Sequence, residues 1–285
     1  MKQEKVRTME DFAALSGISR PTLSKFFNDP ASVRKTTRVR IEDALSRFDY
    51  TPNFYAINQN RQLTRNIGIV VPYLADPFFA EVARKLEPLC SKAGFNPILL
   101  SSHGDPDIEA ANLESLKSIR PAGVLLAPLS RRSRRDEVEA FCRDVPTVVF
   151  DCDIESVGDA FYGSNKTQSI GVIVEYLCRT GEPPAFFEMP NAPNPNAGKL
   201  HIAYEEKMLA LGKTPVFLSA QGKSWDFEAI GYAEGKRMIE ARVLPTNTVL
   251  CSNDRLAIGF LAAAYDSGLR VGLGDGHALR VAGHD

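Results

Sequence analysis

The sequence predicts an all-α head of three short helices, followed by an α/β body of two lobes whose parallel sheets are covered by helices on both faces. In residues 8–48, helix-capping residues and a helix-breaking glycine separate three short amphipathic segments. From residue 67 onward, apolar strand-like runs alternate with helical segments, a pattern typical of parallel sheet. The chain has 285 residues, which is enough for about two domains.

The charge of the chain is divided unevenly between these parts. Residues 1–66 contain 12 Lys and Arg and 7 Asp and Glu, a net charge of +5, whereas the rest contains 22 and 28, a net charge of −6. A basic head on an acidic body favours contact between the head and a polyanion. The composition, 44% hydrophobic and 24% charged without an apolar run of about 20 residues, excludes a disordered or membrane-spanning chain.

The head contains the signals of a helix-turn-helix. Thr8 is a good N-cap for the first helix, Gly17 breaks that helix, and Ser19 caps a second helix that tolerates Pro21 in its first turn. A third helix is expected at about residues 36–48. The side chains that we expect on its inward face are Val39, Ile41, Ala44 and Leu45.

A head of this kind places its second helix in the major groove of DNA. The exposed N-terminal face of that helix would present Arg20, Pro21 and Lys25 to base edges. Four further side chains are better placed for phosphates, which fix register without reading sequence: Thr22, Ser24, Asn28 and Arg38. A three-helix protein-interaction module with solvated charges is the alternative interpretation of the same pattern.

The head closely resembles that of the LacI family of bacterial repressors. The matching features are Ala13, the Gly-Ile-Ser of residues 17–19, the Thr37-Arg38 pair and the Tyr-Thr-Pro-Asn of residues 50–53. In the family the recognition helix starts at the position of Ser19, and the two positions after it, with the basic one at Lys25, choose the operator. Besides those residues and the four named for phosphates, the resemblance implies DNA contacts from Thr8, Thr37, Tyr50 and Asn53.

The hinge of that family, matched here by residues 54–66, is expected to contact DNA as well. In the family this segment folds into a short helix when the dimer meets DNA, and a Leu from it wedges into the minor groove. Ala56 fits the pattern, but Gln59 occupies the wedge position and cannot unstack bases as an apolar side chain does. We expect that Ile57 or Phe54 substitutes for the wedge, or that the operator is bent less.

The body predicts two α/β lobes, at residues 67–178 and 179–285, after a head at residues 1–53. Amphipathic helical segments are expected near residues 78–93, 107–119, 133–143, 166–180, 199–211, 228–241 and 254–267. Open α/β lobes bind ligands at the carboxyl ends of their strands. The expected strands are Ile67–Val71, Asn96–Leu100, Val124–Ala127 and Thr147–Phe150 in the first lobe, and Ala185–Glu188, Val216–Leu218, Val249–Ser252 and Arg280–Ala282 in the second.

The body also resembles the periplasmic-binding-protein-like sensor domain of the LacI family. The loop after the first strand matches one in which an aromatic side chain stacks on the effector, which implies Phe79 or Phe78. A purely structural role for both residues, as anchors of the following helix, stays open. A second stacking aromatic of the family falls at Trp225 or Phe227, and the spacing does not choose between them.

Two further motifs carry expected effector contacts. Cys251-Ser252-Asn253-Asp254 matches a strand-end motif whose Asn bonds the ligand and whose Asp caps the following helix, which makes Asn253 a ligand contact. The last residues match a segment whose Asp takes two sugar hydroxyls, which implies Asp285, because a carboxylate accepts hydrogen bonds from adjacent hydroxyls.

Two departures from the family bear on the ligand. Leu200 stands where the family commonly has an Arg, and Asn165-Lys166 stands where an Asp-Asn pair is expected. Apart from these departures, a Pro- and Asn-rich loop at residues 190–196 is expected at the cleft rim, either as a plain surface loop or in contact with the ligand. Family members also continue beyond the position of Asp285, so we expect either a fragment or a shorter relative.

The expected function is a DNA-binding transcription regulator, a repressor, controlled by a sugar, polyol or related effector between the lobes. The alternative is a constitutive DNA-binding regulator whose sensor is degenerate or truncated. The charged first ten residues contain no signal-peptide core, so we expect a cytoplasmic protein rather than an exported transport protein. We expect a homodimer on a pseudo-palindromic operator, because one small head supplies too few specific contacts.

We expect neither a catalytic centre, a cofactor nor a metal site. The sequence has no Gly-x-Gly-x-x-Gly after a strand, no phosphate-binding loop and no clustered His or Cys ligands. The five cysteines are scattered and are expected to pack as small apolar side chains.

Overall fold

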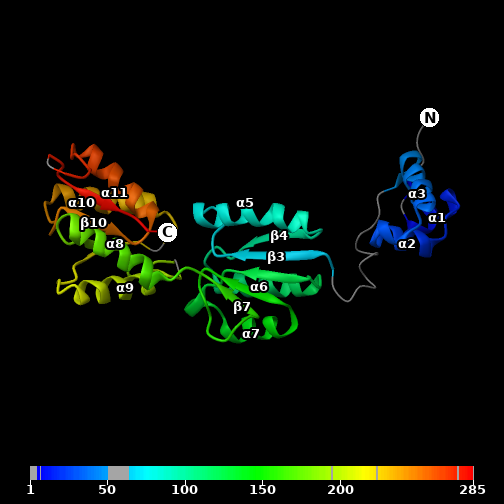
Figure 1. The fold of residues 1–285 in the computed structure, drawn as a ribbon, viewed down its shortest axis with the longest axis horizontal. Coiled ribbons are helices and arrows are strands. Elements are labelled where there is room, and N and C mark those ends of the chain that lie inside the picture. The colour runs from blue at the N-terminus through cyan, green and yellow to red at the C-terminus, as the bar shows by residue number, and fades with distance from the viewer. Residues whose placement is uncertain are drawn as a thin grey trace. The chain divides into compact units, whose positions relative to one another are not determined.

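The chain forms two separate compact units, Met1–Thr64 and Arg65–Asp285, which are described one at a time (Figure 1). The computed structural model describes residues 5, 6, 8–50, 64–193, 195–222, 224–274 and 276–284. Over these residues, no helix is long and apolar enough to cross a membrane.

The first unit is the predicted three-helix head. Its helices are α1 (Met9–Ser16), α2 (Arg20–Asn28) and α3 (Lys35–Arg47), with the short 3-10 turn η1 (Pro30–Ser32) between the last two. Two short strands that no sequence pattern predicts, β1 (Lys5–Val6) and β2 (Asp49–Tyr50), pair in parallel.

Local capping explains the boundaries of α1, the first helix of the head. The Thr8 side chain accepts a hydrogen bond from the backbone N–H of Asp11 at 3.1 Å and so caps α1. Gly17 ends α1 in the left-handed conformation, with φ of 65°. The predicted inward position of Val39 is wrong, since its side chain is 55% exposed. Ile41 and Ala44 define the buried face of α3. Successive residues of a helix are rotated by about 100°, so Val39, two positions before Ile41, points to the opposite, solvent-facing side.

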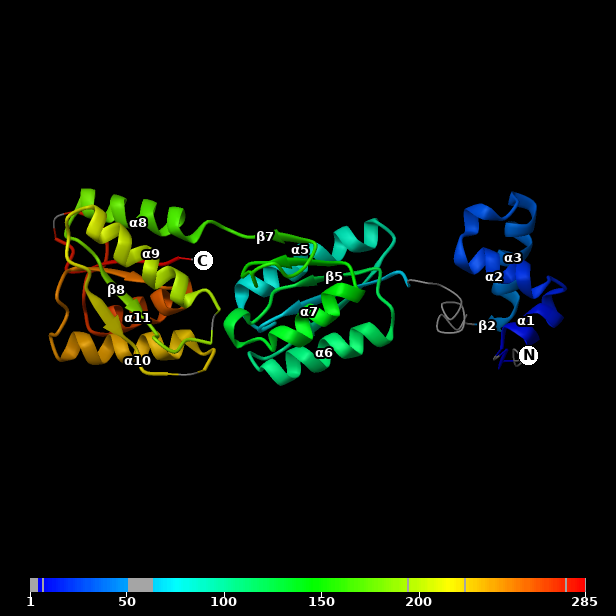
Figure 2. The same cartoon turned by 90° about the horizontal axis from the view of Figure 1, so that it is seen from below.

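The first lobe of the body is a five-stranded parallel sheet of order β4-β3-β5-β6-β7. Helix α5 covers one face, and α6 and α7 cover the other (Figures 1 and 2). The strand β7 was not predicted. The bounds are β3 (Asn66–Val71), α5 (Pro77–Lys92), β4 (Asn96–Ser101), α6 (Pro106–Ser118), β5 (Gly123–Leu126), η2 (Ser130–Arg132), α7 (Arg135–Asp144), β6 (Thr147–Phe150) and β7 (Ala160–Tyr162).

The second lobe is a four-stranded parallel sheet of order β11-β10-β8-β9. Helices α8 and α9 lie on one face, and α10 and α11 lie on the other (Figure 2). The bounds are α8 (Lys166–Thr180), β8 (Ala185–Glu188), α9 (Ala197–Ala210), β9 (Phe217–Ser219), α10 (Phe227–Glu240), β10 (Thr248–Cys251), α11 (Asp254–Asp266) and β11 (Arg280–Ala282).

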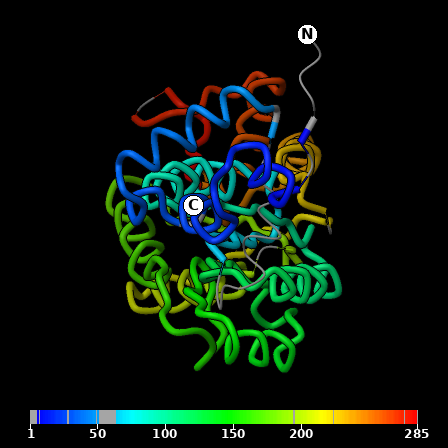
Figure 3. The backbone as a smooth tube through the Cα atoms, turned by 90° about the vertical axis from the view of Figure 1, so that its right-hand side faces the viewer, coloured from blue at the N-terminus to red at the C-terminus, as the bar shows by residue number. Residues whose placement is uncertain are grey.

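The chain passes from the first lobe to the second between β7 and α8 (Figure 2), and Figure 3 draws the same backbone as a tube viewed along the long axis of Figure 1. The whole of α8 packs in the second lobe, where Ile170, Val174 and Leu177 join the cluster around Phe186 and Tyr204. The predicted boundary between the two lobes, at residues 178 and 179, therefore falls inside α8. One apolar cluster contains residues of both lobes, which are thus in contact within this unit.

The predicted fold class is confirmed, with an all-α head and an α/β body of parallel sheets covered on both faces. Every predicted helix and strand corresponds to an observed one. The boundaries differ by a few residues, as expected where caps rather than apolar periodicity set the ends.

Candidate functional site

The N-terminal end of α2 presents a polar, basic surface. Ser19 occupies the N-cap position, and its Oγ lies 2.8 Å from Oγ1 of Thr22. Arg20, Pro21 and Lys25 are exposed, as a base-reading face requires. Nε of Arg20 lies 2.9 Å from Oε1 of Glu10 on α1, and both side chains are well exposed. The guanidinium is therefore paired with a carboxylate that a bound DNA strand would repel.

The other residues predicted to contact DNA differ in how exposed their side chains are. Thr8 is exposed but uses its hydroxyl to cap α1. Tyr50 is buried in the core of the head. Ser24 and Thr37 are half-buried, as is Arg38, whose Nε is buried without a hydrogen-bond partner in the described residues. The side chain of Asn28 and all of Phe54, Gln59, Asn53, Ala56 and Ile57 lie outside the described residues.

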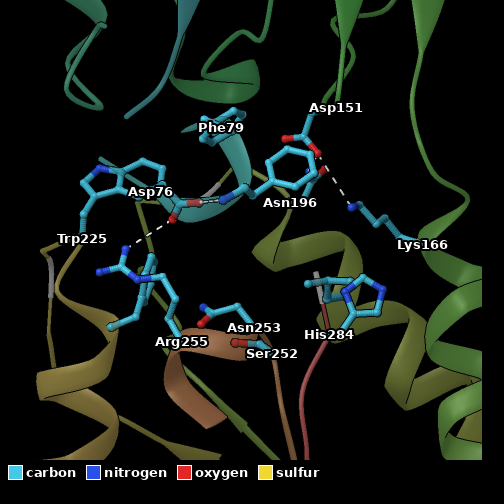
Figure 4. Close-up of a pocket in the computed structure, with 13 residues that line it drawn as sticks. Asp76, Phe79, Asp151, Lys166, Asn196, Trp225, Ser252, Asn253, Arg255 and His284 are labelled. Carbon is cyan, nitrogen blue, oxygen red and sulfur yellow. Dashed lines mark hydrogen bonds and ion pairs between the residues drawn. The ribbon is translucent and has the colours of Figure 1, made fainter. Parts of the chain in front are cut away.

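The body contains a pocket between its lobes, at the carboxyl ends of strands from both sheets (Figure 4). Asp76 follows β3, Asp151 follows β6, Ser252 and Asn253 follow β10, and His284 follows β11. Parallel strands bring these ends to one edge of each sheet, which explains why residues far apart in sequence meet here. The lining residues are Asp76, Phe78, Phe79, Asp151, Lys166, Asn196, Leu200, Trp225, Phe227, Ser252, Asn253, Arg255 and His284.

All four aromatic residues predicted as effector contacts line this pocket. Phe78 and Phe79 begin α5 and lie edge to face, with ring centroids 5.0 Å apart. Phe79 is also part of the apolar cluster, so it has the structural role that the sequence left open. Trp225 and Phe227 reach the pocket together from the start of α10. Geometry thus places both candidates at the site, rather than one of them.

Asn253 lines the pocket and caps a helix at the same time. Its Oδ1 accepts a hydrogen bond from the backbone N–H of Leu256 at 2.8 Å, which makes it the N-cap of α11. The expectation that Asp254 caps this helix is wrong, because Asp254 is already the first helical residue and is exposed. The Nδ2 group of Asn253 makes no hydrogen bond to the described residues and is free to donate to a ligand.

A buried carboxylate and a buried cation face each other on one side of the pocket. Asp151 Oδ1 accepts a hydrogen bond from Nδ2 of Asn196 at 3.0 Å and lies 3.7 Å from Nζ of Lys166. Burial raises the pKa of Asp151, although Lys166 and Asn196 act in the opposite direction. Asp151 is thus a strong acceptor whose hydrogen-bonding capacity is only partly used.

On the other side of the pocket, Arg255 is held between two carboxylates. Its Nε and Nη2 donate to the two oxygens of Glu228 at 2.8 and 2.5 Å, and its Nη1 donates to Oδ2 of Asp76 at 3.2 Å. The guanidinium also lies 5.4 Å from the centroid of the Phe227 ring. The positive charge of Arg255 is therefore already neutralised by protein groups.

His284 completes the polar lining. Its Nε2 lies 2.7 Å from Oγ of Ser169. Burial lowers the pKa of His284, and the nearby Lys166 lowers it further, so the neutral ring is favoured at neutral pH. A neutral imidazole offers a ligand one donor or one acceptor and no charge.

The space at the centre of the pocket is small, about 40 Å³. Pockets that enclose a small molecule usually have volumes of roughly 300 to 1,000 Å³. In the arrangement seen here the lobes therefore leave room for a few water molecules. A ligand of monosaccharide size would need them to separate.

Several lining residues were not predicted as site residues. Asp76, Asp151, Ser252 and His284 immediately follow or lie just beyond strand ends, and that position is the signal that could have identified them. The sequence places Asn196 in a rim loop, and it marks Lys166 and Leu200 only as departures from the family, whereas all three line the pocket. Arg255 also lies just beyond a strand end, that of β10, but its pairing with Asp76 has no sequence signal, because only the approach of the first lobe brings the two together. Asp285 lies outside the described residues.

No group of three or more His, Cys, Asp or Glu side chains in the described part of the chain could hold a metal ion. Cys152 and Cys251 are buried, and burial raises the pKa of both thiols. Neither thiol is thus an activated nucleophile.

Comparison with protein families gives two matches that together cover most of the chain. Residues 8–53 match the model described as bacterial regulatory proteins, lacI family. Residues 64–275 match that of the periplasmic binding proteins and sugar binding domain of the LacI family.

Curated relatives of similar sequence include two kinds of repressor. The ribose operon repressor of Escherichia coli (strain K12) is 27% identical over 271 residues, covering 93% of this chain and 79% of the relative. The HTH-type transcriptional repressor PurR of Histophilus somni (strain 129Pt) is 24% identical over 269 residues, with the same coverage.

Solved structures share the fold. A lac repressor dimer bound to operator and the anti-inducer ONPF has a TM-score of 0.81 at 21% identity, covering 99% of this chain and 83% of that one. A LacI-family regulator from Lactobacillus casei with bound glucose has a TM-score of 0.64 at 23% identity, covering 77% of this chain and 80% of that one.

Proposed function

Because the chain belongs to the LacI family of bacterial regulatory proteins, we propose that it is a repressor that binds an operator through α2, with a small hydroxylated molecule between its lobes as effector. The observation that carries this proposal is the presence, in one chain, of a helix-turn-helix head and a two-lobed body with a polar and aromatic pocket. A head alone would bind DNA without control, and a body alone would bind a ligand without a transcriptional output.

The DNA side of the proposal is supported by the exposed end of α2. Arg20 and Lys25 can donate to guanine O6 and N7 in the major groove, while Thr22 and Ser24 are short donors suited to phosphates. The lac repressor, similar in fold, is a dimer on its operator. We therefore propose a homodimer on a pseudo-palindromic operator. Binding to DNA would take place in the bacterial cytoplasm.

The effector side is supported by the charge balance of the pocket. Arg255 and Lys166 are each paired with carboxylates, which leaves no unpaired cation there for an anionic group among the described residues. Asp151 and the Nδ2 group of Asn253 offer an acceptor and a donor, and Trp225 and Phe227 offer apolar faces. Hydroxyl groups on one face and C–H groups on the other are the features of a neutral sugar or polyol.

A selection experiment tests the DNA side. The purified chain is incubated with random duplexes at low ionic strength, and the enriched sequences are identified. We expect an enriched palindromic site, with affinity that falls steeply as salt is raised. Lys25→Ala should reduce affinity for that site by roughly 5- to 150-fold. Arg47→Ala, at an exposed position on α3, is the matched control. Equal binding to the site and to random competitor would overturn the proposal.

A constitutive regulator is the second candidate, and the narrow pocket favours it. Titration of the operator complex with neutral sugars, polyols and sugar acids separates the two candidates. A ligand-dependent change in operator affinity supports the controlled repressor. Tight operator binding that no compound alters supports the constitutive one.

A further inference from the structure

The hydrogen bond from Asn196 to Asp151 joins the lobes on one side of the pocket, and two other contacts join them on the opposite side. One is the ion pair between Oδ2 of Asp76 in the first lobe and Nη1 of Arg255 in the second, at 3.2 Å, with side chains only 12% and 14% exposed. The other is the stack of Tyr73, which follows β3, on Trp225, with ring centroids 5.2 Å apart and planes inclined by 12°. The ion pair and Trp225 lie on the opposite side of the pocket from Asp151 and Lys166 (Figure 4).

Each partner of the ion pair is held in position by residues of its own lobe. Glu228 and the Phe227 ring hold the Arg255 guanidinium within the second lobe. In the first lobe, Oδ1 of Asp76 accepts from the backbone N–H of Phe78 at 3.0 Å and thereby caps α5. Both partners are thus ordered by their own lobe, so little side-chain entropy is lost when they pair.

The Tyr73–Trp225 stack is likewise supported by residues of the first lobe. The ring of Tyr73 lies edge to face with that of His103, at 6.1 Å between centroids. Next to His103, Gly104 has φ of 72° and leaves room for the indole, since a Cβ at Gly104 would lie 2.7 Å from Nε1 of Trp225. Nε1 is buried without a hydrogen-bond partner in the described part of the chain. Trp225 therefore fills a recess of the first lobe while belonging to the second.

We propose that the Asp76–Arg255 ion pair and the Tyr73–Trp225 stack form a latch that closes the pocket on itself, so that an effector must release the latch in order to enter. The chain passes between the lobes just before Lys166, the first residue of α8, and the latch lies on the opposite side of the pocket from Lys166 (Figure 4). The central space of about 40 Å³ is the consequence, because the latched lobes exclude a ligand of monosaccharide size.

The latch rests on the proposed function only in its consequence for ligands. A protein whose open state is a fraction of the population binds its ligand with an affinity reduced by that fraction. Weakening the latch should accordingly raise effector affinity by the factor by which it raises the open population. The latch itself is tested without ligand and without DNA, so its failure is distinct from failure of the proposed function.

The full chain contains a single tryptophan, Trp225, whose fluorescence reports directly on the latch. The primary variant is Asp76→Asn, because Asn is as good a helix N-cap as Asp but lacks the charge that holds Arg255. Tyr73→Leu is the second variant, which removes the stack without touching the cap. Glu234→Gln is the matched control. The Glu234 carboxylate is about as buried as that of Asp76, but its ion pair with Arg237 lies within α10 and so within one lobe.

Acrylamide quenching of Trp225 and small-angle X-ray scattering are measured for each protein, with circular dichroism to confirm folding. We expect Asp76→Asn and Tyr73→Leu to raise the quenching constant at least twofold and to increase the radius of gyration, with Glu234→Gln unchanged. Folded Asp76→Asn and Tyr73→Leu proteins with wild-type quenching and scattering would overturn the latch. If Asp76→Asn does not fold, the Tyr73→Leu result alone decides.

Discussion

The ring of Tyr50 lies parallel to that of Phe12, with centroids 4.5 Å apart and planes inclined by 12°. Tyr50 belongs to β2, whose parallel pairing places it opposite Val6 of β1. The stack thus packs β2, at the C-terminal end of the head, against the first helix, α1. Burial raises the pKa of the Tyr50 hydroxyl, and Glu10 adds to the effect. This position assigns Tyr50 to the core of the head, although the family resemblance implies a contact with DNA.

Tyr50→Ala should destabilise the head by about 3 to 5 kcal/mol, as expected for removing a buried aromatic side chain. Tyr50→Phe keeps the stack and should change the free energy of unfolding by less than about 1 kcal/mol. Urea unfolding followed by circular dichroism measures both effects. If Tyr50→Phe leaves stability intact but reduces operator affinity tenfold, the hydroxyl contacts DNA and the packing interpretation is insufficient.

Glu10→Gln should strengthen DNA binding. The exposed Glu10–Arg20 pair contributes little to stability, at most about 1 kcal/mol, but it engages a guanidinium that we assign to base readout. Removing the carboxylate frees Arg20 and removes a negative charge near phosphates, so we expect affinity to rise roughly 2- to 5-fold at low salt. Fluorescence anisotropy with a labelled operator measures the change. Asp43→Asn, which breaks the exposed pair with Arg47, is the control, and weaker binding by Glu10→Gln would contradict this assignment.

Substitutions of Asn253 can separate its two roles. Asn253→Ala removes both the cap of α11 and the free Nδ2 donor, and should cost about 1 kcal/mol of stability in addition to effector affinity. Asn253→Asp retains an oxygen that can cap the helix but lacks the donor. We expect it to keep the stability of the parent while effector affinity, measured by calorimetry, falls about tenfold. Unchanged affinity in Asn253→Asp would remove Asn253 from the ligand site.

The stability of the body should depend on His284 between neutral and mildly acidic pH. The groups that act on this ring are Ser169 by hydrogen bonding, Lys166, which lowers its pKa, and Asp254, which raises it, and burial has the largest effect. Because the folded-state pKa is below 6.5, the unfolded chain takes up the proton first as pH falls. The contribution of His284 to the free energy of unfolding is complete above pH 6.5 and is lost as pH falls through the folded-state pKa. Over this range the free energy of unfolding should change by at most about 1.4 kcal/mol per pH unit.

Urea midpoints measured from pH 7.5 to pH 5 check this prediction. His284→Gln cannot titrate in this range, so its stability should vary less with pH than that of the parent. His277→Gln is the control, because His277 lies outside the pocket lining. Parallel pH profiles for the parent and His284→Gln would contradict the assignment.

Much of the architecture could be predicted because local chemistry encodes it. Thr8 and Gly17 bound α1 through a side-chain cap and a left-handed residue, and both signals are visible in one sequence. Continuous apolar runs such as Ile67–Val71 are long enough to identify buried strands. The short strand β7 was missed because its three residues, Ala-Phe-Tyr, are too few to form a recognisable strand pattern.

The candidate site was only partly predictable for a physical reason. Phe79, Trp225 and Asn253 carry motifs next to strand or helix ends, and the structure places them at one pocket, where their contact with an effector stays a prediction. The dual role of Asn253 as cap and lining residue could not be read from its motif, which pointed to Asp254.

By itself, the sequence determined the basic head, the order of helices and strands, and the family whose motifs they carry. Only the tertiary structure decided which charges neutralise one another and how much space the lobes leave. Arg255 meets Asp76 across 179 residues of chain, and the two lobes must pack before that pair exists. Periodicity and capping act over a few residues, whereas the pairing of charges at a pocket depends on how whole sheets are placed.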